Sequence, residues 1–482
     1  MALLVPTAVR RAARTLPRAT AATLGDEVLT YAELDGRADR LGLALRALGV
    51  GHGDRVVWWG DTGLAALPLF VAVGRIGAVF APLDGRLPGD RAGETAAVAR
   101  PRLVVADPAL ADAARTFGHP VVDRLDLERR SDASPAGSAD EPALVETDPH
   151  TLFFTSGSTG APKGVVVSHR ANVLRNQVNP AVEPGASTVC TFPLSHMAGW
   201  SMAMHAFHAR GSVHYTGTAD AATVLATAER HRASRLYCIP AVWRRLLDHG
   251  THHHDLRSLR QADTGTSATP PELVAAIRAA LPDTVTRIYY GSTEAGPGAL
   301  LPHVDLDRKP GSVGIAPPGV DLRITDDGEV CVRSDCLMDG YLDQPDATAA
   351  ALRDGWYHTG DLGELDDEGY LSITGRRRDV IRTGGETVAP VAVEAVLADH
   401  PDVAEVAVVG LPDVDWGEVV CAVVVARPGR PAPTLATLRS HCAGRLPAPM
   451  QPRRLELVAA LPRTAATGQV QRTLLAERLA GA

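Results

Sequence analysis

Lysine is almost absent from this chain. Lys163 and Lys309 are the only lysines among 482 residues, although lysine and arginine together number 48. Arginine has taken the place of lysine almost everywhere, which is typical of a coding sequence rich in guanine and cytosine. A composition bias of this kind does not explain the two lysines that remain. Each of them is therefore more informative about function than a lysine in an ordinary protein.

Other features are also missing, and each absence excludes a class of protein. The six cysteines are scattered and form no C-x-x-C pair, which indicates reduced thiols in a cytoplasmic protein. The net charge of −8 and the lack of a basic stripe exclude nucleic acid as an expected partner. No apolar run is long enough to cross a bilayer, so no membrane partner is expected. Four arginines near the amino terminus lack the long apolar segment of a targeting signal, and we expect no such signal.

The length of the chain indicates at least two domains, because 482 residues are too many for one hydrophobic core. Residues 29–83 alternate between strand and helix patterns, which predicts a layered α/β domain. Residues 126–149 are rich in Arg, Ser, Asp, Pro and Gly, and we predict a loop there.

The carboxy-terminal part has a different pattern. It predicts a helix over residues 391–397 and strands over 403–409 and 419–425, as in a small α+β domain. The predicted fold is thus a large layered α/β domain at residues 1–378, followed by a small α+β domain at 379–482.

The most distinctive stretch reads Thr155-Ser156-Gly157-Ser158-Thr159-Gly160-Ala161-Pro162-Lys163-Gly164. Apolar runs at 152–154 and 165–167 predict a strand on either side of it. Glycines let backbone N–H groups approach phosphate oxygens, hydroxyls add donors, and Lys163 adds a positive charge. The spacing of a Walker loop is absent. A run of serine and glycine can also be interpreted as a simple surface turn, but the combination of residues in this stretch favours a phosphate-binding loop.

The ten residues of this stretch closely resemble the phosphate loop of the adenylate-forming superfamily, which includes acyl-CoA synthetases, luciferases and the adenylation domains of peptide synthetases. Further sequence motifs of this superfamily follow along the chain in the same order as in the family, so the resemblance covers nearly the whole chain. It implies an acid–thiol ligase that uses ATP or AMP as an acyl-adenylate, together with CoA and Mg²⁺. It also implies that the small domain is mobile and rotates between two half-reactions.

The resemblance implies a nucleotide site drawn from several boxes. An aromatic plane can stack an adenine, hydroxyls can hold the α-phosphate, Asp361 can accept two ribose hydroxyls, and Glu294 can hold Mg²⁺. The alternative interpretation of the sequence motif around Glu294 is an ordinary strand end followed by a polar turn. The family usually has Gly-Gly-Ala at residues 265–267, and this chain departs from it. The implied nucleotide-binding residues are Thr155, Ser156, Gly157, Ser158, Thr159, Lys163, Gly265, Thr266, Ser267, Tyr290, Gly291, Ser292, Thr293, Asp361 and Arg376.

The acyl pocket and the thiol passage are implied in the same way. A lone histidine is more often a packed residue, but His196 stands in a P-L-x-H-x-x-G string that in the family flanks the acyl pocket. Asp379 matches the pivot between domains, and Gly384 and Gly385 match a glycine loop that lines the pantetheine passage. The consecutive histidines at 252–254 do not converge on one ion, so we interpret them as a solvated turn. Small and apolar residues suggest room for a bulky acid: Met197, Gly199, Trp200, Gly296 and Gly298.

One departure from the family affects the chemistry. The family ends with P-[KR]-T-x-x-G-K, whose lysine touches the carboxylate and the α-phosphate during adenylation. In this chain Gln469 stands at the place of that lysine, with one extra residue before Gly468. Glutamine keeps a donor but loses the charge, and such a loss typically costs about 2.7–4 kcal/mol, or roughly a hundred- to a thousand-fold in rate. The small domain contains no lysine that would substitute.

These observations support one main hypothesis and two alternatives. The main one is an acyl-CoA synthetase-like enzyme that forms a thioester from an acyl-adenylate, for example one made by a separate enzyme, while its own adenylation is impaired. Persistence of Lys163 and Glu294 favours the first alternative, a complete ATP-dependent carboxylic acid–CoA ligase. The second alternative is a non-catalytic adenylate-binding module, which the intact hinge and glycine loop oppose. Free CoA is favoured over a carrier-protein thiol, and the composition suggests bacterial secondary metabolism.

Overall fold

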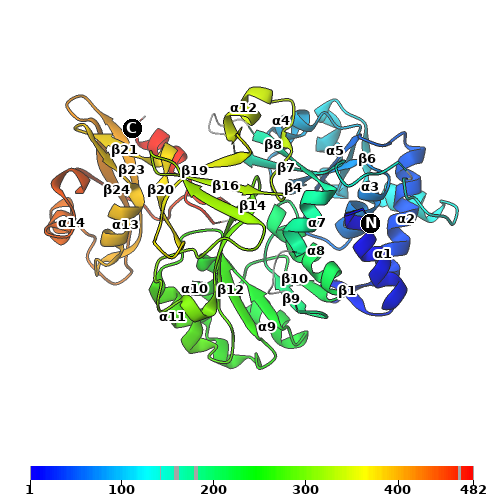
Figure 1. The fold of residues 1–482 in the computed structure, drawn as a ribbon, viewed down its shortest axis with the longest axis horizontal. Coiled ribbons are helices and arrows are strands. Elements are labelled where there is room, and N and C mark those ends of the chain that lie inside the picture. The colour runs from blue at the N-terminus through cyan, green and yellow to red at the C-terminus, as the bar shows by residue number, and fades with distance from the viewer. Residues whose placement is uncertain (1, 142, 157–161, 178–182, 465–467, 481–482) are drawn as a thin grey trace. The chain divides into compact units, whose positions relative to one another are not determined.

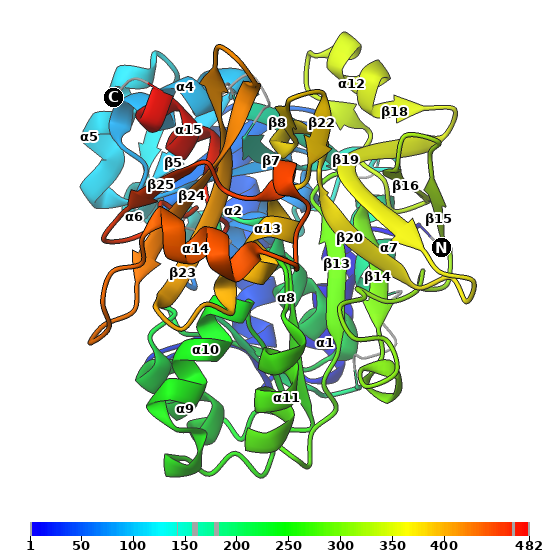
Figure 2. The same ribbon diagram turned by 90° about the vertical axis from the view of Figure 1, so that its left-hand side faces the viewer.

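The computed structural model describes residues 2–141, 143–156, 162–177, 183–464 and 468–480. The described residues divide into two compact units (Figures 1 and 2). The first comprises residues 1–322 and 332–357, and the second comprises 323–331 and 358–482. The predicted α/β fold, with a large amino-terminal and a smaller carboxy-terminal domain, is confirmed. The exact boundary at residues 378 and 379 and the pivot at Asp379 stay predictions.

The first sheet of the larger unit runs in the order β17-β8-β7-β4-β3-β5-β6. Its inner strands pair in parallel and consist almost entirely of buried residues, because a parallel sheet is covered on both faces. β7 and β8 pair antiparallel and confirm the two strands predicted around the phosphate loop. The bounds are β3 Arg55–Gly60, β4 Val79–Asp84, β5 Leu103–Ala106, β6 Val121–Asp123, β7 Pro149–Ser156, β8 Pro162–Ser168 and β17 Gly340–Tyr341.

The second sheet runs in the order β14-β13-β12-β11-β9-β10-β1-β2. Neighbouring strands in the series β12, β11, β9, β10 and β1 pair in parallel. The edge strands β14 and β2 pair antiparallel with their neighbours β13 and β1. The bounds are β1 Thr20–Leu24, β2 Glu27–Thr30, β9 Ser187–Cys190, β10 Ser212–Tyr215, β11 Arg235–Tyr237, β12 Gln261–Gly265, β13 Ile288–Ser292 and β14 Gly296–Leu301.

Helices cover these sheets, and α1, α7 and α8 contact one another (Figure 1). α2 begins at a capping box, in which the Thr30 hydroxyl accepts the N–H of Glu33 and the Glu33 carboxylate accepts that of Thr30. The bounds are α1 Val5–Thr15, α2 Tyr31–Ala47, α3 Ala66–Arg75, α4 Gly89–Ala99, α5 Ala111–Ala114, α6 Arg124–Asp132, α7 His169–Gln177, α8 Met197–Ala209, α9 Ala221–Arg230, α10 Pro240–His249, α11 Pro271–Ala280 and α12 Pro345–Ala351.

The prediction of a loop over residues 126–149 is wrong in its first part, because α6 extends to Asp132. The carboxylate of Asp123 accepts the N–H groups of Leu125 and Asp126 and so caps the start of this helix. Only Leu127 and Ser131 of α6 are buried, so the helix shows little of the apolar periodicity on which the prediction relied.

A third sheet, β15-β16-β19-β18 with β20 beside β19, carries several of the predicted site residues. Its bounds are β15 Val320–Ile324, β16 Glu329–Ser334, β18 Leu352–Arg353, β19 Trp356–Leu365 and β20 Leu371–Arg376. The short helix η5, Arg377–Asp379, follows β20.

The smaller unit is built on the sheet β22-β21-β24-β23, with β25 beside β24. Consecutive residues of β23 and β24 are buried, and because successive side chains point to opposite faces, both faces of the sheet are covered. α13 and α14 cover one face and α15 covers the other (Figure 2). The bounds are β21 Ile381–Thr383, β22 Glu386–Val388, β23 Val403–Asp413, β24 Gly417–Ala426, β25 Arg454–Leu457, α13 Pro390–Ala398, α14 Leu435–Cys442 and α15 Arg472–Ala480. The predicted helix and two strands of this unit are confirmed.

In the described ranges, no helix is both long and apolar enough to cross a membrane.

Candidate functional site

The predicted phosphate loop joins β7 to β8. Thr155 and Ser156 end β7 and pair with Lys163 and Pro162 at the start of β8. The Lys163 ammonium lies 4.7 Å from the centroid of the Tyr341 ring, a cation–π distance. The ends of the loop therefore bring a hydroxyl and the lysine together. The loop residues Gly157, Ser158 and Thr159 lie outside the described residues.

Glu294 lies at these same strand ends. The hydroxyls of Thr155 and Tyr341 both donate to its Oε1, at 3.3 and 3.4 Å. Burial, and secondarily the Glu294 carboxylate, raise the pKa of Tyr341, so this hydroxyl keeps its proton. A carboxylate beside hydroxyls and a phosphate-binding loop is a donor set that Mg²⁺ accepts. The residues present therefore fit the ion that the family implies, with Glu294 to hold it.

Arg175 of α7 was not predicted, although it fixes the position of Glu294. Its guanidinium donates to the backbone carbonyls of Thr293 at 2.8 Å, Glu294 at 3.1 Å and Cys336 at 2.7 Å. Burial lowers the pKa of Arg175 to about 10, which still leaves it charged at neutral pH. Gly296 admits this side chain, because a Cβ there would lie 2.9 Å from Cγ of Arg175. Arg175 is a positioning residue that holds the loop carrying Glu294.

Tyr290 lies on β13, and the neighbouring strand leaves room for its ring. Tyr290 pairs with Ala299, and a Cβ on Gly298 would lie 2.9 Å from Cδ1 of Tyr290. Gly291 is tighter still, since a Cβ there would lie 2.3 Å from the carbonyl oxygen of Gly296. These glycines are therefore required for packing against β14. The adenine-stacking role of Tyr290 and the contacts expected of Ser292 and Thr293 stay predictions.

The segment that departs from Gly-Gly-Ala is strained at its centre. Thr266 has φ of 72°, a region that costs a side chain with a Cβ about 1–2 kcal/mol. Its hydroxyl bonds to the Tyr237 hydroxyl at 2.9 Å, which helps to hold this conformation. Gly265, in contrast, cannot be replaced by a residue with a side chain, because a Cβ there would lie 2.2 Å from the Tyr289 carbonyl oxygen. The chain thus keeps the backbone shape of a glycine pair with a threonine in the second position, followed by Ser267.

His196 caps the start of α8, where its Nδ1 accepts the N–H of Ala198 at 3.2 Å. Burial lowers the pKa of His196 to about 4, so the ring is neutral at physiological pH. Trp200 is fully buried and stacks on Phe70, with the ring centroids 4.3 Å apart. A Cβ on Gly199 would lie 2.5 Å from the carbonyl oxygen of Pro193, so this glycine serves a close backbone contact. The acyl-pocket roles of His196, Met197, Gly199, Trp200, Gly296 and Gly298 stay predictions.

Within the smaller unit, Asp361 and Arg376 lie directly opposite each other on β19 and β20. Arg376 Nε lies 2.9 Å from Asp361 Oδ1, and the Asp361 side chain is 12% exposed. A carboxylate oriented by a guanidinium is a suitable acceptor for two ribose hydroxyls. The two residues that were predicted separately to contact the nucleotide are therefore neighbours.

We predict that Asp361→Ala weakens AMP binding about 10- to 100-fold, because the ribose hydroxyls lose charged acceptors. Isothermal titration calorimetry of both proteins with AMP measures the change. Asp367→Ala is the matched control, since it removes an exposed carboxylate from the turn between the same two strands. Equal AMP affinity in wild type and Asp361→Ala would contradict the ribose assignment.

Gly384 and Gly385 form the turn between β21 and β22. Their φ angles are 59° and 84°, and two positive values in a two-residue hairpin turn favour glycine strongly. The N–H of Gly384 donates to the Trp416 carbonyl oxygen at 2.9 Å, and a Cβ on Gly384 would lie 2.7 Å from the Trp416 ring. Trp416 is 39% exposed, and the Arg453 guanidinium lies 3.7 Å from its ring centroid. Sequence reasoning missed this exposed indole, although a Trp in a polar turn was visible.

The segment around Gln469 is held by Thr464. Gln469 donates its N–H to the Thr464 hydroxyl at 3.1 Å and accepts the Thr464 N–H at 2.8 Å. Residues 464 and 469 are therefore fixed to each other, whereas residues 465–467, among which the extra residue falls, lie outside the described residues. At the predicted hinge, Asp379 Oδ2 lies 3.5 Å from Nη1 of Arg472, which also bonds Glu394.

Two family models match the chain. One, described as AMP-binding enzyme, covers residues 9–342, and the other, AMP-binding enzyme C-terminal domain, covers residues 392–467. An indoleacetate–CoA ligase of Aromatoleum aromaticum is 34% identical over 483 residues, which cover 93% of each chain. A feruloyl-CoA synthase of Amycolatopsis sp is 34% identical over 458 residues, covering 90% of this chain and 91% of that protein.

Solved structures agree with these matches. The ATP-bound MatB from Rhodopseudomonas palustris superposes with a TM-score of 0.91 and 28% identity, covering 100% of this chain and 99% of that chain. The o-succinylbenzoate CoA synthetase from Bacillus subtilis, in complex with its acyl-adenylate intermediate, gives a TM-score of 0.88 and 25% identity, covering 98% of both chains. This chain therefore belongs to the AMP-binding, adenylate-forming enzymes and, within them, to the acid–CoA ligases.

Proposed function

We propose that this enzyme forms acyl-CoA thioesters from acyl-adenylates, and that its own adenylation of free acids is slow. In the first half-reaction a carboxylate oxygen attacks the α-phosphorus of ATP and pyrophosphate leaves. In the second, the sulfur of CoA attacks the acyl carbonyl, the thiol proton is lost, and AMP leaves. The observation that carries the proposal is Gln469, an uncharged side chain where the family places the lysine that serves only the first half-reaction.

The arginines nearest to Gln469 in the chain do not replace the missing charge. Arg463 donates to Glu405 at 2.6 Å and to the Gly468 carbonyl oxygen at 2.8 Å. Arg472 donates to the Glu394 carboxylate at 2.7 Å. Both guanidiniums are therefore engaged with carboxylates of their own unit.

Two features of the smaller unit support the thioester-forming half of the proposal. The Gly384–Gly385 turn keeps the conformation that only glycines adopt easily, and Asp361 keeps the arginine that orients it. An acyl-adenylate delivered by a separate enzyme would serve as substrate, with CoA as the thiol.

A complete ATP-dependent ligase is the second candidate, and specific contacts favour it. Glu294 still accepts the hydroxyls of Thr155 and Tyr341, and Lys163 still stacks over Tyr341. These groups act on ATP and its Mg²⁺ in the family, so their retention supports some adenylation of free acids.

The names of the relatives support a bulky cyclic acid as the acyl group. Indoleacetate, ferulate and o-succinylbenzoate, the acids in three of these names, all carry a ring. We therefore expect synthetic adenylates of indoleacetate or ferulate, mixed with CoA, to give thioester faster than acetyl-adenylate does. Liquid chromatography of the thioester and of released AMP measures the rates. Exclusive use of acetyl-adenylate would contradict the bulky acid, and tight AMP binding without any thioester would support a non-catalytic module.

A further inference from the structure

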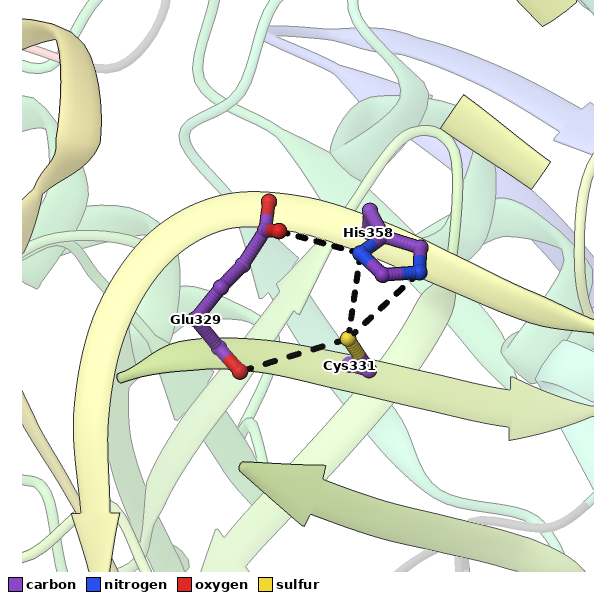
Figure 3. A group of neighbouring side chains, drawn as sticks. All are labelled: Glu329, Cys331 and His358. Carbon is purple, nitrogen blue, oxygen red and sulfur yellow. Dashed lines mark hydrogen bonds and ion pairs between the residues drawn. The ribbon is translucent and has the colours of Figure 1, made fainter. Parts of the chain in front are cut away.

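Three side chains with metal-binding atoms meet in the smaller unit. Glu329 and Cys331 are two residues apart on β16, so their side chains lie on the same face of the strand. His358 comes from β19, the neighbouring strand in the sheet. Figure 3 shows the three side chains turned toward one another. We call them the Glu–Cys–His cluster; in the described part of the chain it is the one group of this kind.

The distances within the Glu–Cys–His cluster are close to those around a tetrahedral zinc ion. His358 Nδ1 lies 3.4 Å from Cys331 Sγ and 3.0 Å from Glu329 Oε2, and the three ligand atoms all lie within 4.8 Å of one another. Zinc bonds of about 2.0–2.3 Å at tetrahedral angles place ligand atoms roughly 3.4–3.6 Å apart. The distance from His358 Nδ1 to Cys331 Sγ therefore already fits, and Nδ1 and Glu329 Oε2 must separate by a few tenths of an ångström to admit the ion.

Burial and charge favour a cation in this place. Glu329 and Cys331 are 5% and 0% exposed, and the His358 side chain is 10% exposed. A thiolate and a carboxylate together neutralise a divalent ion, so the loaded cluster buries little net charge. Thiolate and imidazole ligands select zinc over magnesium or calcium.

Neighbouring groups already hold the carboxylate in position. The N–H of Gly360 donates to Glu329 Oε1 at 3.0 Å, which turns Oε2 toward His358. Outer-shell hydrogen bonds of this kind orient ligands in known metal sites. The Thr359 hydroxyl donates to the Val330 carbonyl oxygen at 2.7 Å and fixes the two strands beside each other. The Arg377 guanidinium donates to Glu329 Oε2 at 3.3 Å and also bonds Asp327, so a cation bound to Oε2 must displace the first of these contacts.

We propose that the Glu–Cys–His cluster binds one Zn²⁺ ion, with a water molecule as the fourth ligand. Binding removes the proton of the Cys331 thiol and requires the neutral His358 to carry its proton on Nε2. The ion would join β16 to β19 three residues before Asp361 and so hold the strand that carries this residue in position. The competing interpretation is a metal-free cluster, in which His358 Nδ1–H donates to Glu329.

Cobalt titration of the full-length protein tests the proposal. After treatment with a chelator and its removal, Co²⁺ is added and the thiolate-to-cobalt absorption is followed. We expect one Co²⁺ per chain, displaced by Zn²⁺, and a higher melting temperature on adding Zn²⁺. Loss of an outer-shell partner typically weakens metal binding about 10- to 100-fold, so Cys331→Ala, which removes a ligand, should lose at least as much.

Two further variants keep the result decisive. Cys421→Ala is the matched control, because Cys421 is also a fully buried strand cysteine of the same unit and should leave cobalt binding unchanged. His358→Gln should weaken binding if Cys331→Ala fails to fold. Absorption without a thiolate band would place the metal elsewhere, for example on His252–His254, and would overturn the proposal. Equal cobalt binding by wild type and Cys331→Ala would also overturn it.

Discussion

Mixed with ATP and a carboxylic acid, the enzyme should release pyrophosphate slowly, whereas a synthetic acyl-adenylate and CoA should give thioester and AMP quickly. The first reaction brings two anions together and lacks the lysine charge that would stabilise them. Removal of one such preorganised group typically costs about a hundred- to a thousand-fold in rate. The second reaction does not use that charge. Exchange of labelled pyrophosphate into ATP measures the first, and chromatography of the thioester measures the second.

Variants at Gln469 sharpen this comparison. Gln469→Ala removes the amide and should change pyrophosphate exchange little, because the amide supplies no charge. Gln469→Lys restores a charge, and the hydrogen bonds between residue 469 and Thr464 keep its backbone in place. Catalysis is sensitive to displacements of about 1 Å, so the extra residue before Gly468 limits this rescue. Brisk exchange in the wild type with a free acid would refute the proposal and identify a complete ligase.

Gly384→Ala should reduce thioester formation from an acyl-adenylate by about 100-fold, the typical effect of a 1 Å displacement near reacting groups. The new Cβ would lie 2.7 Å from the Trp416 ring, which Arg453 covers on one face. Either the turn or the indole must move, and the turn is predicted to line the pantetheine passage. The measurement is kcat/KM for CoA with a fixed acyl-adenylate.

Gly385→Ala is the matched control for Gly384→Ala. Its φ of 84° gives a similar backbone strain, but nothing lies within 4 Å of the position of its Cβ. We expect it to lose about 1 kcal/mol of stability and far less activity. The double variant Gly384→Ala, Trp416→Ala removes the ring that the Cβ meets and should recover part of the activity. AMP affinity checks that each variant is folded, and equal activity losses for both glycines would contradict the role of Trp416.

Much of the fold could be predicted because its signals are local. The strands on either side of the phosphate loop, and the helix and strands of the smaller unit, are marked by unbroken apolar runs or by a single apolar face. α6 was missed because its signal is the cap at Asp123 and not apolar periodicity. The candidate nucleotide-binding residues came from the order of the family's sequence motifs. Local sequence patterns alone would not have assigned these residues to one site.

The contacts that position the site could not be predicted in the same way. Arg175 looks like a surface charge in the sequence, but it is buried and holds carbonyls more than a hundred residues away. Trp200 was assigned to a pocket wall, and its stacking partner Phe70 comes from a distant helix. The Glu–Cys–His cluster forms only because β19 lies beside β16. The sequence does not show this pairing, because it depends on the register of the whole sheet.

The scarcity of lysine makes this protein unusually simple for amine chemistry. Reagents that acylate or alkylate amino groups have only two side-chain targets, Lys163 and Lys309, besides the α-amino group of the chain. Lys163 lies over the Tyr341 ring at the mouth of the predicted phosphate loop, whereas Lys309 is far from it in the sequence. On the proposed function, bound nucleotide shields the first amine and leaves the second as an internal standard. Mass spectrometry of two peptides would then report the occupancy of the nucleotide site without any engineered probe.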